Sequence, residues 1–377
     1  MINIIHICRN TTGGIGTVIK LFSNYLSKSK FRVSTLCLTQ DILNDKFNIS
    51  KAYSEYEILK EEFRKYKGSN NIAHFHGGWT FHVLLLNNIR IPSIISPHGA
   101  LHKISLKKSK LLKYIAKTLY MKKAYSNATC ILAATEDEVQ DIHDFGLKNK
   151  CIALIPNSIN LNEKLIVDDL LKKKLLTSAG EKKILLSLSR LHVSKGLDIL
   201  IDAFYNLSLV DNSFVLFIVG DGDKKYTEKL NRKIKEFNME KKIFMLGSMI
   251  GKNKNTVYDV ADLYILPSYN EGFGLTVLEA LRQNTPVITT TATSFKEIDR
   301  VGCGWYINPT VNDIYLTLVN ATRLTKQELL LKGQLGHTWV EDNYSVSIIN
   351  RKIETLYSWL VHGGDTPEFI MDNTINE

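Results

Sequence analysis

The chain has 377 residues, of which 44% are hydrophobic and 23% are charged, and this composition excludes a disordered or fibrous protein. A chain of this length suits two domains of roughly 150 to 200 residues each. The sequence contains no apolar run of about 18 residues and no secretory signal pattern. We therefore expect a cytoplasmic protein whose contact with a membrane is peripheral.

The excess positive charge lies in the first half of the chain. Residues 1–160 carry 22 Lys and Arg against 11 Asp and Glu, whereas residues 161–377 carry 26 against 27. This asymmetry predicts that the first half faces an anionic partner, either nucleic acid or an acidic membrane surface. A basic face that only keeps the protein soluble is the alternative.

The cysteines show no metal-binding or redox spacing. Cys8, Cys37, Cys130 and Cys151 all lie in apolar, strand-like runs without a CxxC pattern. We expect them to be small core residues with free thiols in a reducing compartment.

Short apolar runs alternate with longer amphipathic stretches, a pattern typical of βαβ units and parallel sheets. The first series of predicted strands comprises 2–7, 32–38, 72–75, 93–96, 129–134 and 151–155. The second series comprises 184–188, 214–219, 243–246, 263–266 and 287–289. The predicted fold class is α/β, with two Rossmann-like, doubly wound domains.

A polar, lysine-rich segment separates the two series. We place an N-terminal domain at 1–160, an interdomain linker at 161–182, a C-terminal domain at 183–345, and a helical segment at 346–377 that crosses back to the N-terminal domain. The loops at the strand C-termini of two such domains can face each other across a cleft, and ligands bind to such loops. This cleft is the expected active site.

The first predicted strand is followed by Gly13, Gly14 and Gly16 and then by a helical stretch. Glycines let backbone N–H groups approach a phosphate at a helix N-terminus. Because the spacing differs from G-x-G-x-x-G, an ordinary tight turn remains an alternative.

Histidines end two neighbouring strands of the first series. His74 and His76 close one strand and His98 follows the next, so all three are expected at the cleft. We expect His98 to act as a hydrogen-bonding or acid–base group. A zinc site formed by the three histidines is a weaker alternative, because no Cys or carboxylate lies nearby, and we expect no metal.

A basic amphipathic helix is predicted from Lys103 to Lys123. At 100° per residue its lysines fall on one side and its leucines and isoleucine on the other. The functional interpretation is an acceptor-domain helix that docks on anionic lipid, and the alternative is a surface helix packed on its own core. The lysines predicted to contact the acceptor side or the membrane are Lys107, Lys110, Lys113 and Lys117.

Two cations follow the first strand of the second series. Arg190 and Lys195 stand five residues apart, ahead of Gly196 and a predicted helix, and can neutralise a diphosphate leaving group. Further along, Asp221 and Asp223 form a D-x-D string, a pattern that could bind a metal ion. Here we expect Asp223 to cap the following helix instead.

The segment from Pro267 to Ala280 carries the strongest pattern, because a strand, a glycine-rich turn and a helix follow in order. The N–H groups of 274–276 would point out of the helix N-terminus toward a ligand. Glu271 in the turn and Glu279 in the helix can accept hydrogen bonds from sugar and ribose hydroxyls.

Glu271 and Glu279, with seven residues between them, resemble the E-x7-E motif of glycosyltransferase family 4, whose members are retaining enzymes of the GT-B fold. Further segments are similar to family motifs and follow in the family's order over nearly the whole chain. They are Gly13-Gly14-x-Gly16, Ser96-Pro97-His98-Gly99, Ile155-Pro156-Asn157, Arg190 with Lys195-Gly196, and Gly220-Asp221-Gly222. The chain departs from the common Ile-Pro-Asn-Gly pattern at Ser158.

The resemblance implies roles for these residues. Arg190 and Lys195 would hold the donor diphosphate, Glu279 the ribose, and Glu271 with nearby amides the transferred sugar and its phosphate. His98 would lie near the reacting carbon. The catalytic set is thus His98, Glu271, Arg190 and Lys195, and the donor-binding set is Gly13, Gly14, Gly16, Arg190, Lys195, Gly220, Glu271, Gly272, Phe273, Gly274, Leu275, Thr276 and Glu279.

The implied function is a retaining transferase that moves a hexose or an N-acetylhexosamine from a nucleotide-diphosphate sugar to a lipid-linked or oligosaccharide acceptor. Its product would be a bacterial-type surface polysaccharide, such as lipopolysaccharide or capsule, or a glycolipid. The expected partners are the donor, the acceptor and the anionic inner surface of the cytoplasmic membrane. We expect no nucleic acid, cofactor or metal to take part.

Two other functions are weaker. A nicotinamide-dependent oxidoreductase would use the first glycine loop and Asp41, but it leaves Glu271 and Glu279 without a role. A non-catalytic module that binds a polyanion or saccharide would use the basic first half. The lysines lack the interleaved aromatic residues and the RNA-binding signature that nucleic-acid binding would favour.

Overall fold

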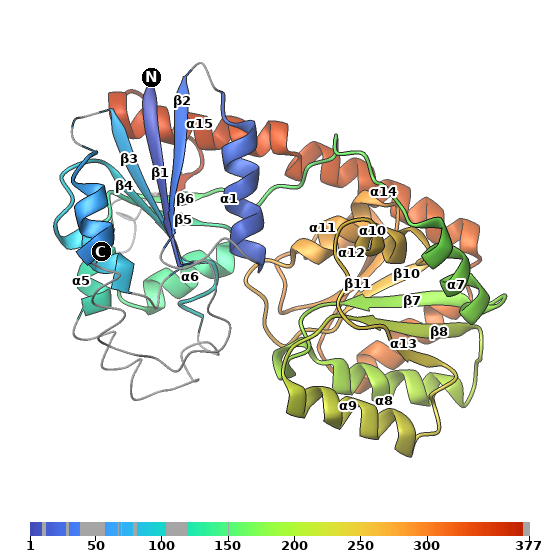
Figure 1. Ribbon diagram of the computed structural model, residues 1–377. Helices are drawn as coiled ribbons and strands as arrows, with labels where there is room; N and C mark the ends of the chain where they lie inside the picture. Colours follow the sequence, from blue (N-terminus) through green and yellow to red (C-terminus); the bar gives the residue numbers. More distant parts are fainter. Residues whose placement is uncertain are drawn as a thin grey trace. The chain divides into compact units, whose positions relative to one another are not determined.

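The computed structural model describes residues 1–9, 13–27, 30–37, 57–66, 68, 70–77, 81–102, 120–149 and 151–371. The chain divides into two compact units, which are coloured along the sequence in Figure 1. Unit 1 comprises Met1–Ser158 together with Val346–Glu377, and unit 2 comprises Ile159–Ser345.

The described part of unit 1 contains a seven-stranded sheet in the order β13-β6-β5-β4-β3-β1-β2, in which only the edge strand β13 is antiparallel. The chain order of the parallel strands from β2 is that of a flavodoxin-like sheet, whose strand order reverses between β1 and β3. The strands are β1 (Ile2–Cys8), β2 (Phe31–Cys37), β3 (Asn71–His76), β4 (Ser93–Ser96), β5 (Cys130–Ala133), β6 (Ile152–Leu154) and β13 (Ile370–Met371).

Helices cover both faces of this sheet (Figure 1). On one face α1 (Gly13–Tyr25) packs beside α15 (Val346–His362). The side chains that alternate toward the other face form an apolar core with the 3₁₀ helix η1 (Phe81–Asn87), α5 (Lys122–Ser126) and α6 (Glu136–Asp144). The C-terminal helix α15 thus belongs to unit 1, where Tyr357 is fully buried.

In unit 2 the described residues form a six-stranded parallel sheet in the order β12-β11-β10-β7-β8-β9. This is the Rossmann order, with the reversal between β7 and β10. The fold class predicted from the sequence, two doubly wound α/β domains, is confirmed. The strands are β7 (Lys183–Leu188), β8 (Phe214–Val219), β9 (Ile243–Met245), β10 (Leu263–Leu266), β11 (Val287–Thr290) and β12 (Gly304–Ile307).

The unit 2 helices also lie on both faces of the sheet (Figure 1). On one face are α8 (Leu197–Ser208), α9 (Lys224–Glu236) and α13 (Val311–Thr322), whose apolar sides build the main core of the unit. Grouped with the other face are α7 (Asp169–Ala179), α10 (Gly251–Asp259), α11 (Leu275–Arg282), α12 (Ile298–Val301) and α14 (Lys326–Tyr344). The segment 161–182 is part of this unit rather than a free linker, because α7 packs on α10.

Every predicted strand is present within one residue of its predicted bounds. Two strands were not predicted. β12 is a short edge strand that begins at a glycine and is only half buried, so it lacks a continuous apolar run. β13 has two residues, too few to give any periodic pattern.

The prediction that all four cysteines are free core thiols is wrong for two of them. Cys130 and Cys151 form a disulfide, because they stand at the starts of the neighbouring strands β5 and β6 with their Cα atoms 4.7 Å apart. Cys8 is a buried thiol, as predicted.

Within the part of the chain that the structure describes, we find no helix with the length and apolarity needed to cross a bilayer. The predicted basic helix, with Lys107, Lys110, Lys113 and Lys117, lies outside the described residues.

Candidate active site

The predicted donor site of unit 2 lies at the point where the strand order of its sheet reverses. The loop after β7 carries Arg190 and Lys195, and the loop after β10 carries Glu271. Since β7 and β10 are neighbours, their loops meet at the carboxyl edge of the sheet, where ligands bind in open α/β folds.

Backbone contacts fix the two loops to each other. The Tyr269 N–H donates to the Ser194 carbonyl at 2.8 Å. Gly196 follows a single 3₁₀ turn, η3 (Val193–Lys195), with a left-handed φ of 63°, and a Cβ atom there would lie 2.1 Å from the Pro267 carbonyl oxygen. Only glycine allows this approach, which sets the position of Lys195 relative to the β10 loop.

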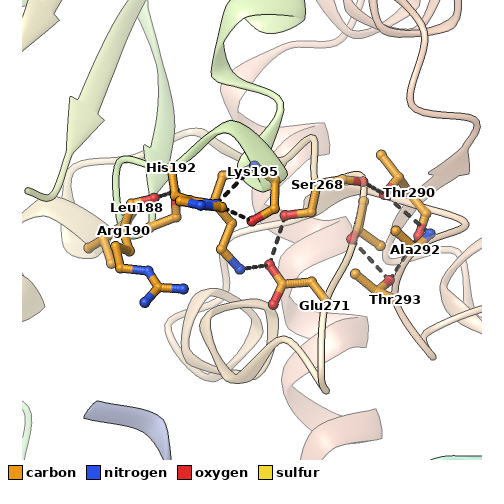
Figure 2. Close-up of polar contacts among 12 residues, drawn as sticks. Leu188, Arg190, His192, Lys195, Ser268, Glu271, Thr290, Ala292 and Thr293 are labelled. Atoms are coloured by element: carbon orange, nitrogen blue, oxygen red, sulfur yellow. Dashed lines mark hydrogen bonds and ion pairs between the residues drawn. The ribbon is translucent and has the colours of Figure 1, made fainter. Parts of the chain in front are cut away.

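Lys195 and Glu271 form an ion pair across the two loops, with Nζ 2.5 Å from Oε1 (Figure 2). Their side chains are only 15% and 10% exposed. The Ser268 hydroxyl also donates to Glu271 Oε1 at 2.7 Å, and Thr290 of β11 donates to the Ser268 carbonyl at 2.6 Å. The carboxylate is therefore held by a lysine and a hydroxyl and does not cap a helix.

Arg190 is exposed and, in Figure 2, extends to the same side of the β7 loop as the Lys195 side chain. Within the described part of the chain it has no ion-pair partner. Its guanidinium is therefore available to an anion, and a planar fork of N–H donors suits phosphate oxygens.

Helix α11 begins directly after this loop. Its N-cap is Gly274, with a φ of 96° and no side-chain cap, so the first N–H groups of the helix, at Leu275 and Thr276, have no capping acceptor. Phe273 is buried and packs edge-to-face on Phe295 with ring centroids 5.3 Å apart. Phe273 thus anchors the turn through its side chain and can offer a ligand only its backbone.

Glu279 lies one helical turn into α11 and is held by α10. Lys254 Nζ lies 2.7 Å from Glu279 Oε1, and the Tyr258 hydroxyl donates to Oε2 at 3.0 Å. Tyr264 of β10 is buried, and this burial is the main cause of its pKa lying well above the usual value. A side-chain hydrogen bond with Thr276 lowers this pKa, and the charges of Glu271 and Glu279 raise it. Glu271 contacts Ser268, which follows β10. Tyr258, the hydroxyl partner of Glu279, packs on Tyr264 of β10 with ring centroids 5.7 Å apart.

The loop after β8 packs against the β7 loop. A Cβ atom at Gly220 would lie 1.9 Å from the Ser189 carbonyl oxygen, so Gly220 serves a close backbone approach. Asp223 is the N-cap of α9 and accepts from the Tyr226 N–H at 2.8 Å, which confirms its predicted capping role.

In unit 1 the predicted glycines stand at the start of α1, where Gly13 has a φ of 66° and Gly16 is buried. Among the residues that the structure describes, no atom would lie within 4 Å of a Cβ at Gly13 or Gly14. His98 follows β4, partly buried, and its Nε2 lies 3.0 Å from His76 Nδ1.

Several partners in these sites escape sequence reasoning. The pairing of Lys195 with Glu271, the contacts of Lys254 and Tyr258 with Glu279, and the burial of His6 beside His76 join residues far apart in the chain. The signal that could have found His6 is the adjacency of the first and third strands, which places it in register with His74.

The backbone approach at Gly196 leads to a stability prediction. We expect Gly196→Ala to lower the free energy of unfolding of unit 2 by at least about 2 kcal/mol, because the methyl group overlaps a carbonyl as well as straining φ. Gly302→Ala is the matched control: Gly302 has the same left-handed conformation, with a φ of 78° and a ψ of 13°, and its Cβ would make only an ordinary contact with the Leu335 side chain at 3.8 Å. That variant should lose only about 1 kcal/mol. Equal losses in urea unfolding of the two variants would contradict the close packing of the loops.

Comparison with known proteins supports a single family. The model of glycosyltransferase family 4 matches residues 12–163, and that of glycosyl transferases group 1 matches residues 169–315. Mannosylfructose-phosphate synthase of Agrobacterium fabrum is 32% identical over 44% of this chain and 38% of its own length. The Escherichia coli enzyme named UDP-Gal:alpha-D-GlcNAc-diphosphoundecaprenol alpha-1,3-galactosyltransferase is 27% identical over 71% of this chain and 67% of its own length.

Among solved structures, sucrose-phosphate synthase from Thermosynechococcus elongatus shares the fold. Its TM-score is 0.78 at 17% identity, and the match covers 97% of this chain and 100% of that one. Two doubly wound units of this kind make up the GT-B fold. With the two family models matched in succession along the sequence, the chain belongs to glycosyltransferase family 4.

Proposed function

We propose that the protein transfers a hexose or an N-acetylhexosamine, with retention of anomeric configuration, from a nucleotide-diphosphate sugar to a lipid-linked saccharide acceptor. The observation that carries the proposal is the Lys195–Glu271 pair at the reversal point of the unit 2 sheet. A cation there can bind a diphosphate, and the carboxylate beside it can bind the hydroxyls of the attached sugar.

The distribution of charge in the site fits this donor. Arg190, Lys195 and the uncapped start of α11 are all favourable to an anion, and we place the leaving diphosphate, which gains charge in the reaction, among them. Glu279 lies one turn deeper, beside Tyr258, and suits the ribose hydroxyls. Because protein cations can neutralise the diphosphate, we expect no metal requirement.

In the proposed reaction, the acceptor hydroxyl attacks the anomeric carbon from the face that the diphosphate leaves. The leaving phosphate accepts the hydroxyl proton, so no protein nucleophile takes part. Arg190 and Lys195 stabilise the departing charge, Glu271 orients the sugar, and His98 of unit 1 hydrogen-bonds the transferred sugar.

The acceptor assignment is supported by one relative. The name of the E. coli galactosyltransferase specifies a diphosphoundecaprenol-linked acceptor and a UDP-sugar donor. A lipid-linked acceptor agrees with the positive charge of residues 1–160, which would draw that part of the protein to an anionic membrane surface. We place the enzyme in surface polysaccharide or glycolipid synthesis, at the inner face of the cytoplasmic membrane.

The decisive test is a donor screen on purified protein with UDP- and GDP-sugars and a diphosphoundecaprenol-linked saccharide. We expect one donor to release nucleoside diphosphate in an acceptor-dependent way, equally with and without a chelator, and NMR of the product to show retained configuration. A thermal-shift assay with NAD and the same nucleotide sugars provides the counter-test. Stabilisation by NAD without any response to nucleotide sugars would refute the proposal.

Membrane association gives a separate prediction. Lys107→Glu, Lys110→Glu and Lys113→Glu together should abolish most of the sedimentation with vesicles that contain anionic lipid, since each near-surface lysine contributes about 1 kcal/mol. Donor binding should stay the same, and a Lys235→Glu, Lys241→Glu, Lys242→Glu variant in unit 2, with the same change in net charge, provides the control. Equal vesicle binding before and after the triple substitution would remove the membrane role.

A further inference from the structure

Four histidines of unit 1 form a connected group where the strand order of its sheet reverses. His6 of β1 pairs in register with His74 of β3, and His76 lies two residues further along β3. Side chains two residues apart on a strand share a face, and here that face packs on Phe22 of α1 and on α15. His98 follows β4, the next strand.

Burial keeps these imidazoles neutral. It lowers the pKa of His6 to about 3 and that of His98 to about 4. Burial, and then the neighbouring histidines, hold the pKa values of His74 and His76 well below the ordinary one. A neutral imidazole carries one N–H donor and one bare nitrogen that accepts, so each ring has a defined hydrogen-bond polarity.

Three of the rings are linked in a chain. His6 Nδ1 lies 2.8 Å from His76 Nε2, and His76 Nδ1 lies 3.0 Å from His98 Nε2. Each contact requires a proton on one nitrogen and none on the other. Because every ring has one of each, the choice at one end determines the others: all three carry their proton on Nδ1, or all three carry it on Nε2.

The His6 end of the chain distinguishes the two arrangements. His6 Nε2 is buried and has no hydrogen-bond partner among the residues that the structure describes. A proton on this nitrogen would be a buried N–H without an acceptor, which is rare and costly in proteins. With the proton on Nδ1, the N–H groups of His6 and His76 both donate along the chain, and that of His98 is left for another partner.

We propose that His6 and His76 are positioning residues that hold the proton of His98 on Nδ1, so that His98 offers an N–H donor to an oxygen of the transferred sugar. This inference rests on the proposed function, which supplies the partner of His98. The hydrogen-bonded rings also restrict rotation of the His98 imidazole, because its Nε2 accepts from His76 and His6 holds the His76 ring in turn.

The turn that carries His98 is built to hold it. His98 has a φ of 53°, a left-handed conformation that is uncommon outside glycine and recurs at functional sites. Buried Glu138 accepts from the Gly99 N–H at 2.7 Å and from the Ala134 N–H at 2.8 Å. One carboxylate thus joins the loops after β4 and β5 and supports the strained turn.

A metal site is the alternative interpretation of these histidines. Ligand nitrogens of His6, His74 and His76 lie within 4.8 Å of one another and could hold a metal ion. Both nitrogens of His74 already have partners, the Tyr357 hydroxyl at 2.7 Å and the Ser96 hydroxyl at 2.8 Å. A metal would have to displace one of them and break one of the two ring hydrogen bonds of His76, because both nitrogens of that ring are also engaged. The geometry favours the hydrogen-bonded chain.

Two-bond ¹H–¹⁵N correlation spectra of protein labelled with ¹⁵N-histidine show which ring nitrogen carries the proton. At neutral pH and without substrate we expect the proton on Nδ1 in His6, His76 and His98, with signals assigned from single-histidine variants. A proton on Nε2 of His98 would overturn the proposal. Stoichiometric shifts of the His6, His74 and His76 signals on addition of Zn²⁺ would overturn it in favour of a metal site.

Turnover gives the second measurement. His6→Leu removes the donor to His76, and kcat should fall about tenfold while the KM for the nucleotide sugar stays the same. His6→Asn keeps an amide N–H near the position of Nδ1 and should restore most of the lost kcat. Exposed His143→Gln serves as the control. A wild-type kcat in His6→Leu would contradict the positioning role.

The two measurements distinguish a failure of the proposed function from a failure of this inference. The spectra need no substrate, so a wild-type protein that transfers no sugar would refute the proposed function without deciding the position of the His98 proton. An active enzyme with His98 protonated on Nε2 would overturn this inference alone. If His6→Leu does not fold, the wild-type spectra and the kinetics of His6→Asn still decide the proposal.

Discussion

Lys195→Ala should lower the rate of sugar transfer by about 10²-fold or more, equivalent to about 2.7 kcal/mol of transition-state stabilisation. The reason is twofold. The departing diphosphate loses a cation, and the Glu271 carboxylate, only 10% exposed, keeps just the Ser268 hydroxyl among its described partners. A carboxylate without its cation repels the donor phosphates as well as losing its fixed orientation.

The matched control is Lys233→Ala. Lys233 of α9 forms an ion pair with Asp202 of α8, with 2.6 Å between Nζ and Oδ2, and this pair joins two helices rather than the β7 and β10 loops. Its removal should leave transfer unchanged, which separates loss of an ion pair in general from loss of this one. Initial rates at saturating acceptor, with thermal unfolding to verify the fold, provide the measurement. Unchanged turnover in Lys195→Ala would exclude this residue from the site.

Unit 1 should lose stability steeply as the pH falls from about 6.5 to about 4. Desolvation, nearly complete for His6 and His82 and partial for His98, holds their folded-state pKa values below the unfolded value of 6.5, near 3 for His6 and near 4 for His82 and His98. In this window the unfolded chain binds protons that the folded one does not. Each such histidine therefore stabilises the fold fully above pH 6.5, and each costs about 1.4 kcal/mol per pH unit on acidification.

Glu138 acts in the opposite direction. Burial is the main cause that raises its pKa to about 7, against the lowering effect of its two backbone hydrogen bonds. Its contribution is present below pH 4.5 and is lost as the pH rises through 7. Several histidines outweigh one carboxyl group, so the net effect of acid is destabilising.

Hydrogen exchange of the β1 and β3 peptides between pH 4.5 and pH 6, corrected for intrinsic rates, measures the effect in unit 1 alone. His6→Leu should reduce the slope of unfolding free energy by about 1.4 kcal/mol per pH unit, whereas exposed His143→Gln should not change it. A wild-type slope in His6→Leu would mean that His6 is protonated equally in the folded and unfolded states.

The fold could be predicted because fully buried parallel strands read as continuous apolar runs, such as the run Phe214–Val219. Edge strands have no such signal, and Gly304–Ile307 was missed for this reason. The pairing of Cys130 with Cys151 was also missed, since it depends on which strands become neighbours. Strand order is a property of the whole sheet and does not follow from any local pattern.

The donor site was predictable as a set of loops but not as a set of contacts. Lys195 and Glu271 each stand beside a glycine, shortly after a predicted strand. This position indicated that both would lie at the carboxyl edge of the sheet. Their ion pair could not be read from residues 76 positions apart. We propose that a donor engages both side chains of this ion pair together.

The most direct test of the donor site is a crystal structure of the protein with a nucleoside diphosphate bound. We predict that the diphosphate contacts Lys195 Nζ, the Arg190 guanidinium and the N–H groups at the start of α11, with the ribose hydroxyls on Glu279. A nucleotide bound only at Gly13 and Gly14 of unit 1, away from Lys195 and Glu279, would contradict this assignment.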